Sequence, residues 1–323
     1  MTTIDNMPLL DAMDVLTDLR LLYDPNYSRA DDQLVFRDLQ KRQMPDLDRE
    51  QFQTLYAEWQ DRYAAIRTTL ERVRADVVVL NEAWQASSSE DQASALGRDL
   101  GLAAVARYLP HERGMLTGNA ILTRWPILRT DSRLLSATRS VLSAEVDAPQ
   151  GRLTAFATHL TWRPDHSRRR QQEVRQVLEF IGSQPRSVFP PVLMGDLNAE
   201  PGSDELRMLT GRMAVPVSSL VFADAWEQAG ENTPGHTWDK SNPYLADEPW
   251  PSRRIDYILL GLPTAEPVAG WFLPLRCWVD GLTQVSDVQP SDHYAVVAEL
   301  RCVRARGKEP HQGGTFGVDH VAG

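Results

Sequence analysis

The stretch Pro-Pro-Val-Leu-Met-Gly-Asp-Leu-Asn-Ala-Glu-Pro, at residues 190–201, decides the interpretation of this chain. Val192 to Met194 is a short apolar run typical of a buried strand, and a glycine follows it. Because side chains alternate along an extended chain, Asp196 and Asn198 face one side and Leu197 the other. A strand that ends in a carboxylate and an amide is where α/β sheets usually carry chemistry. An Asx-type turn, in which both side chains bind only backbone amides, is the alternative interpretation of this stretch alone.

The other apolar patterns predict a framework in which strands and helices are mixed along the chain. Apolar and aromatic residues recur at helical spacing over about 48–74, and this stripe indicates a face that packs on the core. Strands are expected at 14–20, 76–80, 103–108, 120–123, 139–146, 152–158, 192–194, 255–260 and 294–300, and helices at 31–43, 48–74, 91–100 and 165–182. The strands at 139–146 and 152–158 flank a Pro-Gln-Gly turn and predict a hairpin.

Composition restricts the class of protein. The chain has 323 residues, 42% of them hydrophobic, which is enough for one large domain. No apolar run reaches the ~18 residues that span a bilayer, and the acidic stretch Met1 to Asp14 lacks a secretory layout, so we expect a cytoplasmic protein. The net charge of -10 disfavours broad binding to nucleic acid, which relies on Lys and Arg, but it does not exclude a local basic groove.

Acidic, amide and imidazole side chains stand at the borders of five apolar runs. These residues are Glu82, His159, Asp196 with Asn198, Asp256, and Asp292 with His293. Each has a plain alternative interpretation as a cap, a turn residue or a charge at a strand edge. If the borders converge, at least four carboxylates share one cleft and require a compensating cation or protonation. Hard oxygen ligands without a cysteine or histidine set favour Mg²⁺ or Mn²⁺ over zinc.

An ordered set of sequence blocks resembles the endonuclease/exonuclease/phosphatase superfamily. The blocks run in family order from about residue 76 to residue 300, and the combination is more specific than any one of them. They are Val79-Leu80-Asn81-Glu82, Gly118-Asn119-Ala120-Ile121-Leu122, Thr158-His159-Leu160, Gly195-Asp196-Leu197-Asn198-Ala199, Arg254-Ile255-Asp256-Tyr257-Ile258 and Ser291-Asp292-His293-Tyr294. The resemblance implies an α/β fold, a four-layer sandwich of two packed mixed β-sheets flanked by helices, with the site at one rim.

The resemblance also implies roles for the border residues. Glu82 is the expected principal Mg²⁺ ligand, with Asp292 close to the metal. Asp196 and Asn198 are expected to position or deprotonate the attacking water and to hold the phosphate. The remaining expected catalytic residues are His159, which donates to a phosphate oxygen, and His293, which Asp256 orients.

The N-terminal part departs from the family pattern. Thr17-Asp18-Leu19 stands where Thr-x-Asn-Leu is expected, with one residue missing, and Asp18 is predicted to replace the usual asparagine as an oxygen ligand. We expect a single domain over 1–306, with a helical insertion near 31–74 that covers the site. The Gly/His/Lys-rich stretch at 307–323 predicts a disordered tail.

These features predict a Mg²⁺-dependent phosphoesterase that hydrolyses a phosphodiester. A phosphomonoesterase or a nuclease of the same superfamily, or a catalytically silent binding module, remains the alternative. Substrate choice is expected in the loops 111–118, 162–168 and 238–251. Contacts with the substrate are predicted for Asn119, Arg254 and Trp238, and Trp238 has the alternative role of pinning its loop to the sheet.

Four arginines near the start of the expected helix 165–182 form a basic cluster. They are Arg168, Arg169, Arg170 and Arg175. Charge runs of this kind are more often a solvated helix face than a phosphate clamp, and both interpretations stay open here.

Overall fold

Two layers of β-structure form the centre of the molecule. The structure is a computed structural model that describes residues 62–86, 91–110, 115–264 and 269–305. One layer is a six-stranded sheet in the order β4-β5-β6-β7-β9-β8. Its strands are β4 (Ile127–Leu134), β5 (Ser140–Ala148), β6 (Gly151–Thr158), β7 (Val192–Asp196), β8 (Phe222–Asp224) and β9 (Asp256–Gly261).

The second layer consists of two antiparallel sheets in the described residues. A three-stranded sheet has the order β1-β3-β2, and β10 pairs with β11 in a two-stranded sheet. Their strands are β1 (Val77–Ala86), β2 (Ala103–Pro110), β3 (Met115–Thr123), β10 (Gly270–Asp280) and β11 (Ala295–Arg304). The single parallel pair in the described sheets, β6 with β7, lies in the six-stranded sheet, which is therefore the mixed one.

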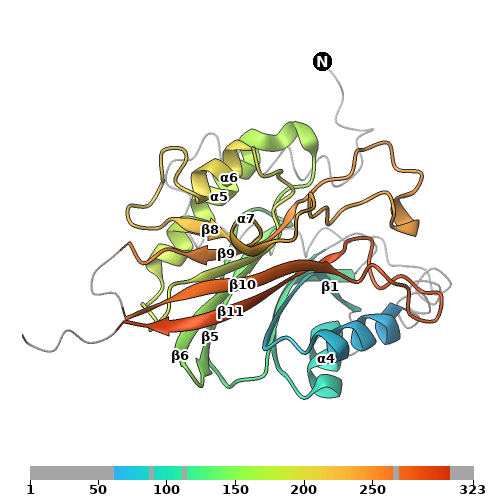
Figure 1. Ribbon diagram of the computed structural model, residues 1–323, viewed down its shortest axis with the longest axis horizontal. Helices are drawn as coiled ribbons and strands as arrows, with labels where there is room; N and C mark the ends of the chain where they lie inside the picture. The colour runs from blue at the N-terminus through green and yellow to red at the C-terminus, as the bar shows by residue number, and fades with distance from the viewer. Residues whose placement is uncertain (1–61, 87–90, 111–114, 265–268, 306–323) are drawn as a thin grey trace, which may run out of the picture.

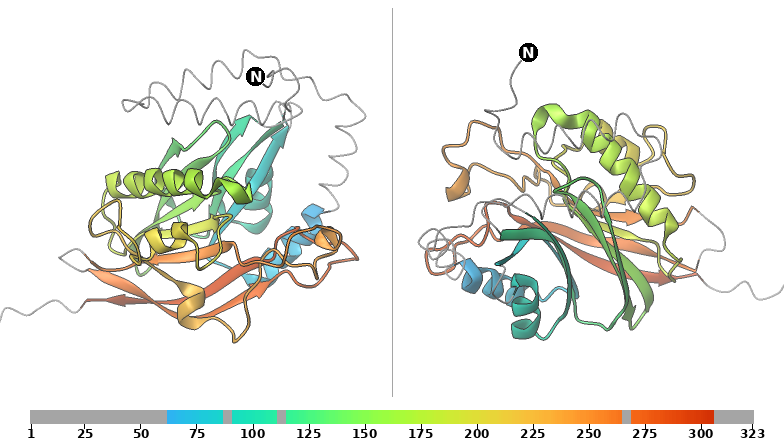
Figure 2. Two further views of the ribbon diagram at one scale, coloured as in Figure 1. Left: turned by 90° about the horizontal axis from the view of Figure 1, so that it is seen from above. Right: turned by 180° about the vertical axis from the view of Figure 1, so that it is seen from behind.

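Helices cover the outer faces of both layers, as Figures 1 and 2 show. On one side, α5 and α6 pack on the six-stranded sheet through a cluster that includes Phe156, Leu178 and Leu193. On the other side, α4 and the helical residues 62–73 pack on the three-stranded sheet. The helices are α4 (Gln92–Leu100), α5 (Ser167–Ser183), α6 (Asp204–Leu209) and α7 (Ala225–Ala229), with 3₁₀ turns at η3 (Pro164–His166) and η4 (Pro243–Leu245).

Two further apolar clusters lie between the β layers. Ile121, Val146 and Ala155 belong to the cluster that joins the three-stranded sheet to β5 and β6. Val192 and Cys277 belong to a cluster that joins β7 and β9 to β10, β11 and α7. The order helix, sheet, sheet, helix confirms the expected α/β class.

Local sequence explains where the elements next to the site begin and end. The hairpin of β5 and β6 forms as expected, with Ala148 opposite Gly151. The crossover that parallel neighbours require is supplied by α5, which connects β6 to β7. Ser203 caps α6 by accepting a hydrogen bond from the amide of Leu206, so the chain turns into a helix directly after the Asp-Leu-Asn sequence.

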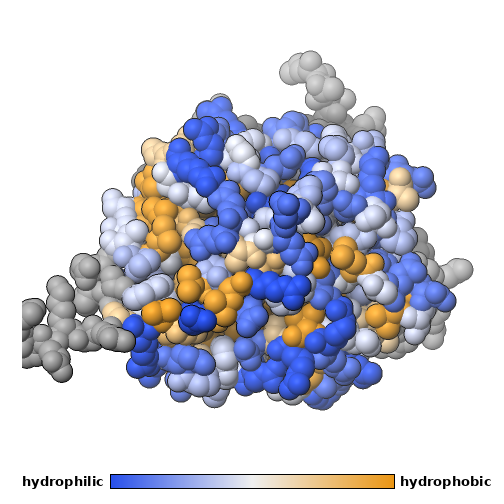
Figure 3. All heavy atoms as spheres, viewed as in Figure 1, coloured by the Kyte–Doolittle hydropathy of each residue, from blue (hydrophilic) through white to orange (hydrophobic). Residues whose placement is uncertain are grey.

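The face of the molecule seen in Figure 3 is mostly hydrophilic. Figure 3 shows separate apolar patches on the face that β10 and β11 cross, and Leu273 and Leu275 of β10 are among the exposed apolar residues. Within the described residues, no helix has both the length and the hydropathy that a bilayer crossing requires. The expected strand at 14–20, the expected helix at 31–43, most of the helix at 48–74 and the tail at 307–323 lie outside the described residues.

Gly195 of β7 lies in contact with the backbone of β6. Its φ is +134°, and a Cβ built at this position would lie 2.0 Å from the Thr158 carbonyl oxygen and 2.9 Å from Asn81 Oδ1. Any side chain here would therefore push β7 away from β6 and would occupy a backbone conformation that disfavours L-residues.

Replacement of Gly195 should consequently lower stability and move Asp196. We expect Gly195→Ala to destabilise the protein by on the order of 2 kcal/mol or more, measured by urea unfolding. The control is Gly202→Ala, because nothing lies within 4 Å of a Cβ at Gly202. Equal stability of the two variants would contradict the close approach of β6 and β7.

Candidate active site

The expected border residues come together at one end of the two β layers. Asp196 at the end of β7 lies opposite Asp256 at the start of β9 in the antiparallel register. His293 lies in the segment that leads into β11, and His159 follows the last residue of β6. Residues that are far apart in sequence thus meet because their strands end at the same rim.

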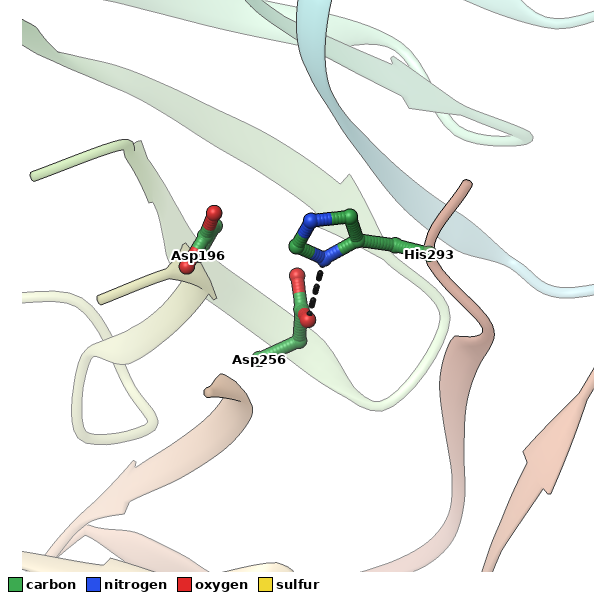
Figure 4. A group of neighbouring side chains, drawn as sticks. All are labelled: Asp196, Asp256 and His293. Carbon is green, nitrogen blue, oxygen red and sulfur yellow. Dashed lines mark hydrogen bonds and ion pairs between the residues drawn. The ribbon is translucent and has the colours of Figure 1, made fainter. Parts of the chain in front are cut away.

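Asp196, Asp256 and His293 form the tightest group. One ligand atom from each residue lies within 4.8 Å of the others, and the group is the one cluster of metal-ligating side chains found among the described residues. His293 Nδ1 and Asp256 Oδ2 are 2.8 Å apart. Figure 4 shows the Asp256 carboxylate directed at the imidazole of His293, with the Asp196 side chain facing the ring. The pairing leaves His293 Nε2 as the nitrogen that can serve a substrate.

The charges of this group are strongly coupled. Burial, and next the Asp256 carboxylate, raise the pKa of Asp196 to about 7 against the opposing charge of His293. Burial alone would lower the pKa of His293, but the charge and hydrogen bond of Asp256, with Asp196 and Asp292, raise it to about 10. Near neutral pH, His293 is therefore cationic and Asp196 is divided between its two protonation states.

His159 is buried and neutral. Burial, followed by the charges of Arg139 and His293, lowers its pKa well below the usual value. Asn198 Nδ2 lies 3.1 Å from His159 Nε2, and it also donates to Leu160 O at 3.1 Å. An amide NH₂ can only donate, so Nε2 accepts and the imidazole proton resides on Nδ1.

Asn81 is a site residue that sequence reasoning did not select. Its Oδ1 accepts a hydrogen bond from the Asp196 amide at 2.8 Å, and its Nδ2 donates to Thr158 O at 3.0 Å. Asn81 Nδ2 also donates to Asn119 Oδ1, and Asn119 in turn donates to Ser140 O. Asn119, predicted to bind substrate, is buried in this network behind the site and does not line the cleft described below. The only signal for Asn81 in the sequence was its position directly before Glu82.

The Gly/Pro/Asn-rich region at 230–251 holds the backbone of the site in place through buried side chains. Thr237 Oγ1 accepts hydrogen bonds from the amides of Ile255 and Asp256, each at 3.2 Å. Asn242 Nδ2 donates to Ser291 O at 2.8 Å and to Asp292 O at 3.0 Å. Thr237 and Asn242 are fully buried. This loop therefore fixes the backbones that carry Asp256 and His293.

Two residues predicted to contact the substrate are also buried. Arg254 Nη1 donates to Asp224 Oδ2 at 2.6 Å, and both residues are at most 5% exposed. The structure does not bring Arg254 to the Asp196 group. Trp238 is 8% exposed and packs with Leu245 and Ile255, although it lines one edge of the cleft.

The expected metal ligands are at the cleft but outside the tight group. The side chain of Glu82 is 68% exposed, with its Oε1 3.8 Å from His159 Nδ1, and Glu82 has a positive φ of 54° at the irregularity in β1. The side chain of Asp292 is 49% exposed, and its Oδ1 is 3.9 Å from Arg62 Nη2. Asp18 lies outside the described residues.

The donor set fits a hard divalent cation. Glu82, Asp292, Asp196 and Asp256 line one cleft, and burial already opposes the ionisation of Asp196. A cation would offset this excess of carboxylate charge, and oxygen donors suit Mg²⁺ or Mn²⁺. The protonated imidazole of His293 is the less suitable donor, because a metal ligand must be deprotonated.

Arg139 is a second residue that sequence reasoning did not select for the site. It directly precedes β5, and its charge lowers the pKa of both His159 and Asp196. In the described part of the chain, Arg139 Nε is buried and has no hydrogen-bond partner. In the sequence it was only the first residue of an expected strand.

The site opens into a cleft of about 1700 Å³. Polar residues of the site and strand residues of both β layers line it. Three large aromatic side chains on its lining are exposed, namely Trp162, Tyr244 and Trp250. The cleft is therefore larger than a phosphate group requires, and its rim offers flat apolar surface.

Comparison with known proteins reveals a clear relationship. Residues 52–293 match the sequence profile of the Endonuclease/Exonuclease/phosphatase family. A solved endonuclease/exonuclease/phosphatase structure from Beutenbergia cavernae is similar, with a TM-score of 0.56 and 26% identity. That match covers 74% of this chain and 66% of the other, slightly less than two thirds of its length. No curated protein sequence matches the chain.

Two TDP2 structures are also similar. One is D. rerio TDP2 complexed with single strand DNA product, with a TM-score of 0.58 and 22% identity over 75% of this chain and 92% of that chain. The other is truncated Caenorhabditis elegans TDP2, with a TM-score of 0.54 and 18% identity over 80% of this chain and 95% of that chain. At these identities the likeness concerns the fold.

The raised pKa of Asp196 predicts a stability effect with a definite sign. The raised pKa lets the folded state hold the Asp196 proton up to about pH 7, whereas an unfolded aspartate loses it near its ordinary pKa of 3.8. Stability from this group is therefore present at acid pH and is lost as pH rises through about 7. We expect Asp196→Asn to raise Tm at pH 8 in metal-free buffer, by about 2–4 °C for each kcal/mol gained in the free energy of unfolding. At pH 4 the rise in Tm should be smaller.

Asp239 provides a control with the opposite sign. Burial would raise its pKa, but hydrogen bonds from Ser241 and His236 outweigh burial and hold it below the usual value. Asp239→Asn should therefore lower Tm at pH 8 relative to pH 4. The burial of an ionisable Asp196 would be contradicted if the Tm difference between Asp196→Asn and the parent stayed constant or became smaller from pH 4 to pH 8.

Proposed function

The chain belongs to the endonuclease/exonuclease/phosphatase family, and from this premise we propose that it hydrolyses a phosphodiester by in-line attack of water at phosphorus. Members of this family are generally hydrolases of phosphoester bonds. The observation that carries the proposal is the buried group of Asp196, Asp256 and His293, in which a carboxylate of raised pKa faces a cationic imidazole.

Asp196 is the general base in this proposal. A pKa of about 7 makes its ionised form both available and basic enough near neutral pH. It accepts a proton from the attacking water as the oxygen of that water bonds to phosphorus. The bond from phosphorus to the leaving-group oxygen breaks on the opposite side, and that oxygen departs with the electron pair and takes a proton from solvent. Asn198 holds the carboxylate in place, because its backbone amide donates to Asp196 Oδ1 at 2.7 Å and its side chain donates to Oδ2 at 3.2 Å.

The imidazoles serve the phosphate oxygens. His293, which Asp256 keeps charged up to about pH 10, donates from Nε2 to a phosphate oxygen and stabilises charge that develops in the transition state. His159 stays neutral, so its Nδ1–H supplies a donor without further charge. Arg139 adds positive potential close to both His159 and Asp196.

A divalent cation completes the proposal. Family members typically use one, and Glu82 and Asp292 would hold Mg²⁺ or Mn²⁺ at this cleft, beside the Asp196 and Asp256 carboxylates. When bound, the cation neutralises phosphate oxygens that the single cationic imidazole cannot neutralise alone. Asp18 remains a proposed further ligand.

A nucleic-acid substrate is the second candidate. One similar structure is a TDP2 with a single strand DNA product, and the aromatic rim of the cleft would suit a base. The net charge of -10 argues against a long polyanion. A small phosphodiester that carries one flat group agrees better than a long nucleic acid with both the aromatic rim and the negative net charge.

Loss of Asp196 or of His293 should remove turnover without unfolding the protein. Asp196→Ala and His293→Ala are each expected to lower kcat on bis(4-nitrophenyl) phosphate by on the order of 10²–10⁴-fold, because each removes one positioned group. His236→Ala is the matched control, since His236 also pairs with an aspartate, at 3.0 Å from Asp239, but lies outside the cleft lining. Near-parent turnover of a folded Asp196→Ala or His293→Ala variant would reject the assigned roles.

Activity should also depend on a hard divalent cation. Treatment with EDTA is expected to abolish hydrolysis of the same ester, and Mg²⁺ or Mn²⁺ should restore it. Elemental analysis of the treated protein confirms that metal has been removed. Full activity of the metal-free protein, or restoration by zinc alone, would refute the expected cation chemistry.

A further inference from the structure

The arginine cluster at the start of α5 divides into two pairs. Arg168 and Arg175 are exposed, as expected for a solvated helix face, whereas Arg169 and Arg170 are buried. Arg169 and Arg170 are each 5% exposed, and Glu173 and Glu205 are fully buried. Arg170 Nε donates to Glu205 Oε1 of α6 at 2.8 Å, and Arg169 Nε lies 3.4 Å from Glu173 Oε1. Two cations and two anions thus neutralise one another in the interior.

These buried charges hold one short backbone segment beside the site. Glu173 accepts from the Thr161 amide at 2.9 Å and from the Thr161 hydroxyl at 2.6 Å. Arg170 Nη1 donates to Thr161 O at 3.2 Å and to Arg163 O at 2.6 Å. Hydrogen bonds to charged groups are stronger than neutral ones, and here they are shielded from water. The backbone is therefore fixed on both sides of residue 162.

Trp162 is the residue between these two anchors. Its side chain is 57% exposed and lines the cleft together with His159 and Asp196. One exposed aromatic residue is ordinary on a protein surface. Here, however, Thr161 donates two hydrogen bonds to the buried Glu173, and the buried Arg170 donates one each to the carbonyls of Thr161 and Arg163, so the residues on each side of Trp162 are fixed. An aromatic ring on a rigid support loses little conformational entropy when a ligand packs on it.

We propose that Trp162 determines substrate specificity by stacking on a flat aromatic group that the substrate carries beyond its scissile phosphate. In this proposal Glu173 and Arg170 are positioning residues that act through the backbone of Thr161 and Arg163. The inference rests on the proposed phosphodiesterase function and adds the chemical class of the substrate to it. Stacking of an aromatic side chain on a base contributes about 1–3 kcal/mol, which corresponds to roughly 5–150-fold in binding.

Two synthetic esters with the same leaving group test the contact. Thymidine 5′-(4-nitrophenyl) phosphate carries a flat base, and methyl 4-nitrophenyl phosphate carries none. Trp162→Ala should lower the ratio of kcat/KM for the thymidine ester over the methyl ester by about 10-fold, mainly through KM, and Trp162→Phe should lower it less. Leu128→Ala is the control, because Leu128 is 44% exposed and lies outside the cleft lining.

The positioning role has its own variants. Thr161→Val removes the hydroxyl that donates to Glu173, and it should lower the same ratio, whereas Thr161→Ser keeps the hydroxyl and should restore it. A purely structural role of Thr161 would lower both esters equally and leave the ratio unchanged. That result would overturn the positioning part of the proposal.

The outcomes separate this inference from the proposed function. If the parent hydrolyses the esters, the proposed function is upheld. The inference is then overturned if Trp162→Ala leaves the ratio of the two kcat/KM values unchanged, or if Trp250→Ala lowers this ratio and Trp162→Ala does not. If the parent hydrolyses neither ester, the proposed function fails, and calorimetric titration with thymidine 5′-monophosphate then decides the contact. Binding about 5-fold weaker in Trp162→Ala would support it, and equal affinity would overturn it.

Discussion

The side chain of Asn81 ties the two β layers together at the site. It belongs to β1 of the three-stranded sheet, yet it accepts a hydrogen bond from the Asp196 amide of β7 in the six-stranded sheet. Its amide nitrogen reaches the Thr158 carbonyl at the end of β6 in the same sheet. The separation of the sheets at this rim is thus set by one amide group and by the absence of a side chain at Gly195. The geometry of the carboxylates follows from that separation.

Burial and the neighbouring charges together set the protonation states of the site residues. Asp196 is removed from water beside Asp256, a second acidic group, and its ionisation becomes unfavourable. His293 and Arg139 supply the opposing charge, and only His293 is held by a direct hydrogen bond within the group. The environment raises the pKa of Asp196 to about 7 and that of His293 to about 10, so near neutral pH Asp196 can accept a proton while His293 keeps its charge. The neutral His159 adds a donor without disturbing this balance.

The sequence could predict the α/β class and the convergence of the site residues at one cleft, because each of them follows or precedes a recognisable apolar run. These residues are Glu82, His159, Asp196, Asp256 and His293. The buried roles of Asn119 and Arg254 could not be predicted. Their partners, Ser140 and Asp224, are 21 and 30 residues away, and no local periodicity encodes such pairings. In the arginine cluster, Arg168 and Arg175 are solvated as expected, but the burial of Arg170 could not be predicted, since its partner Glu205 lies 35 residues away.

The buried charges beneath residues 161–163 restrict how this part of the protein can change over evolutionary time. Loss of one member leaves an uncompensated charge in the interior, which costs on the order of 3–5 kcal/mol, whereas joint replacement of both partners by apolar residues of similar volume is often neutral. Arg170 with Glu205, and Arg169 with Glu173, should therefore vary as pairs among descendants of this sequence. Since both pairs hold the segment of Trp162, such an exchange would also loosen the cleft wall. A change of the buried residues of α5 would therefore also change which substrates the cleft prefers.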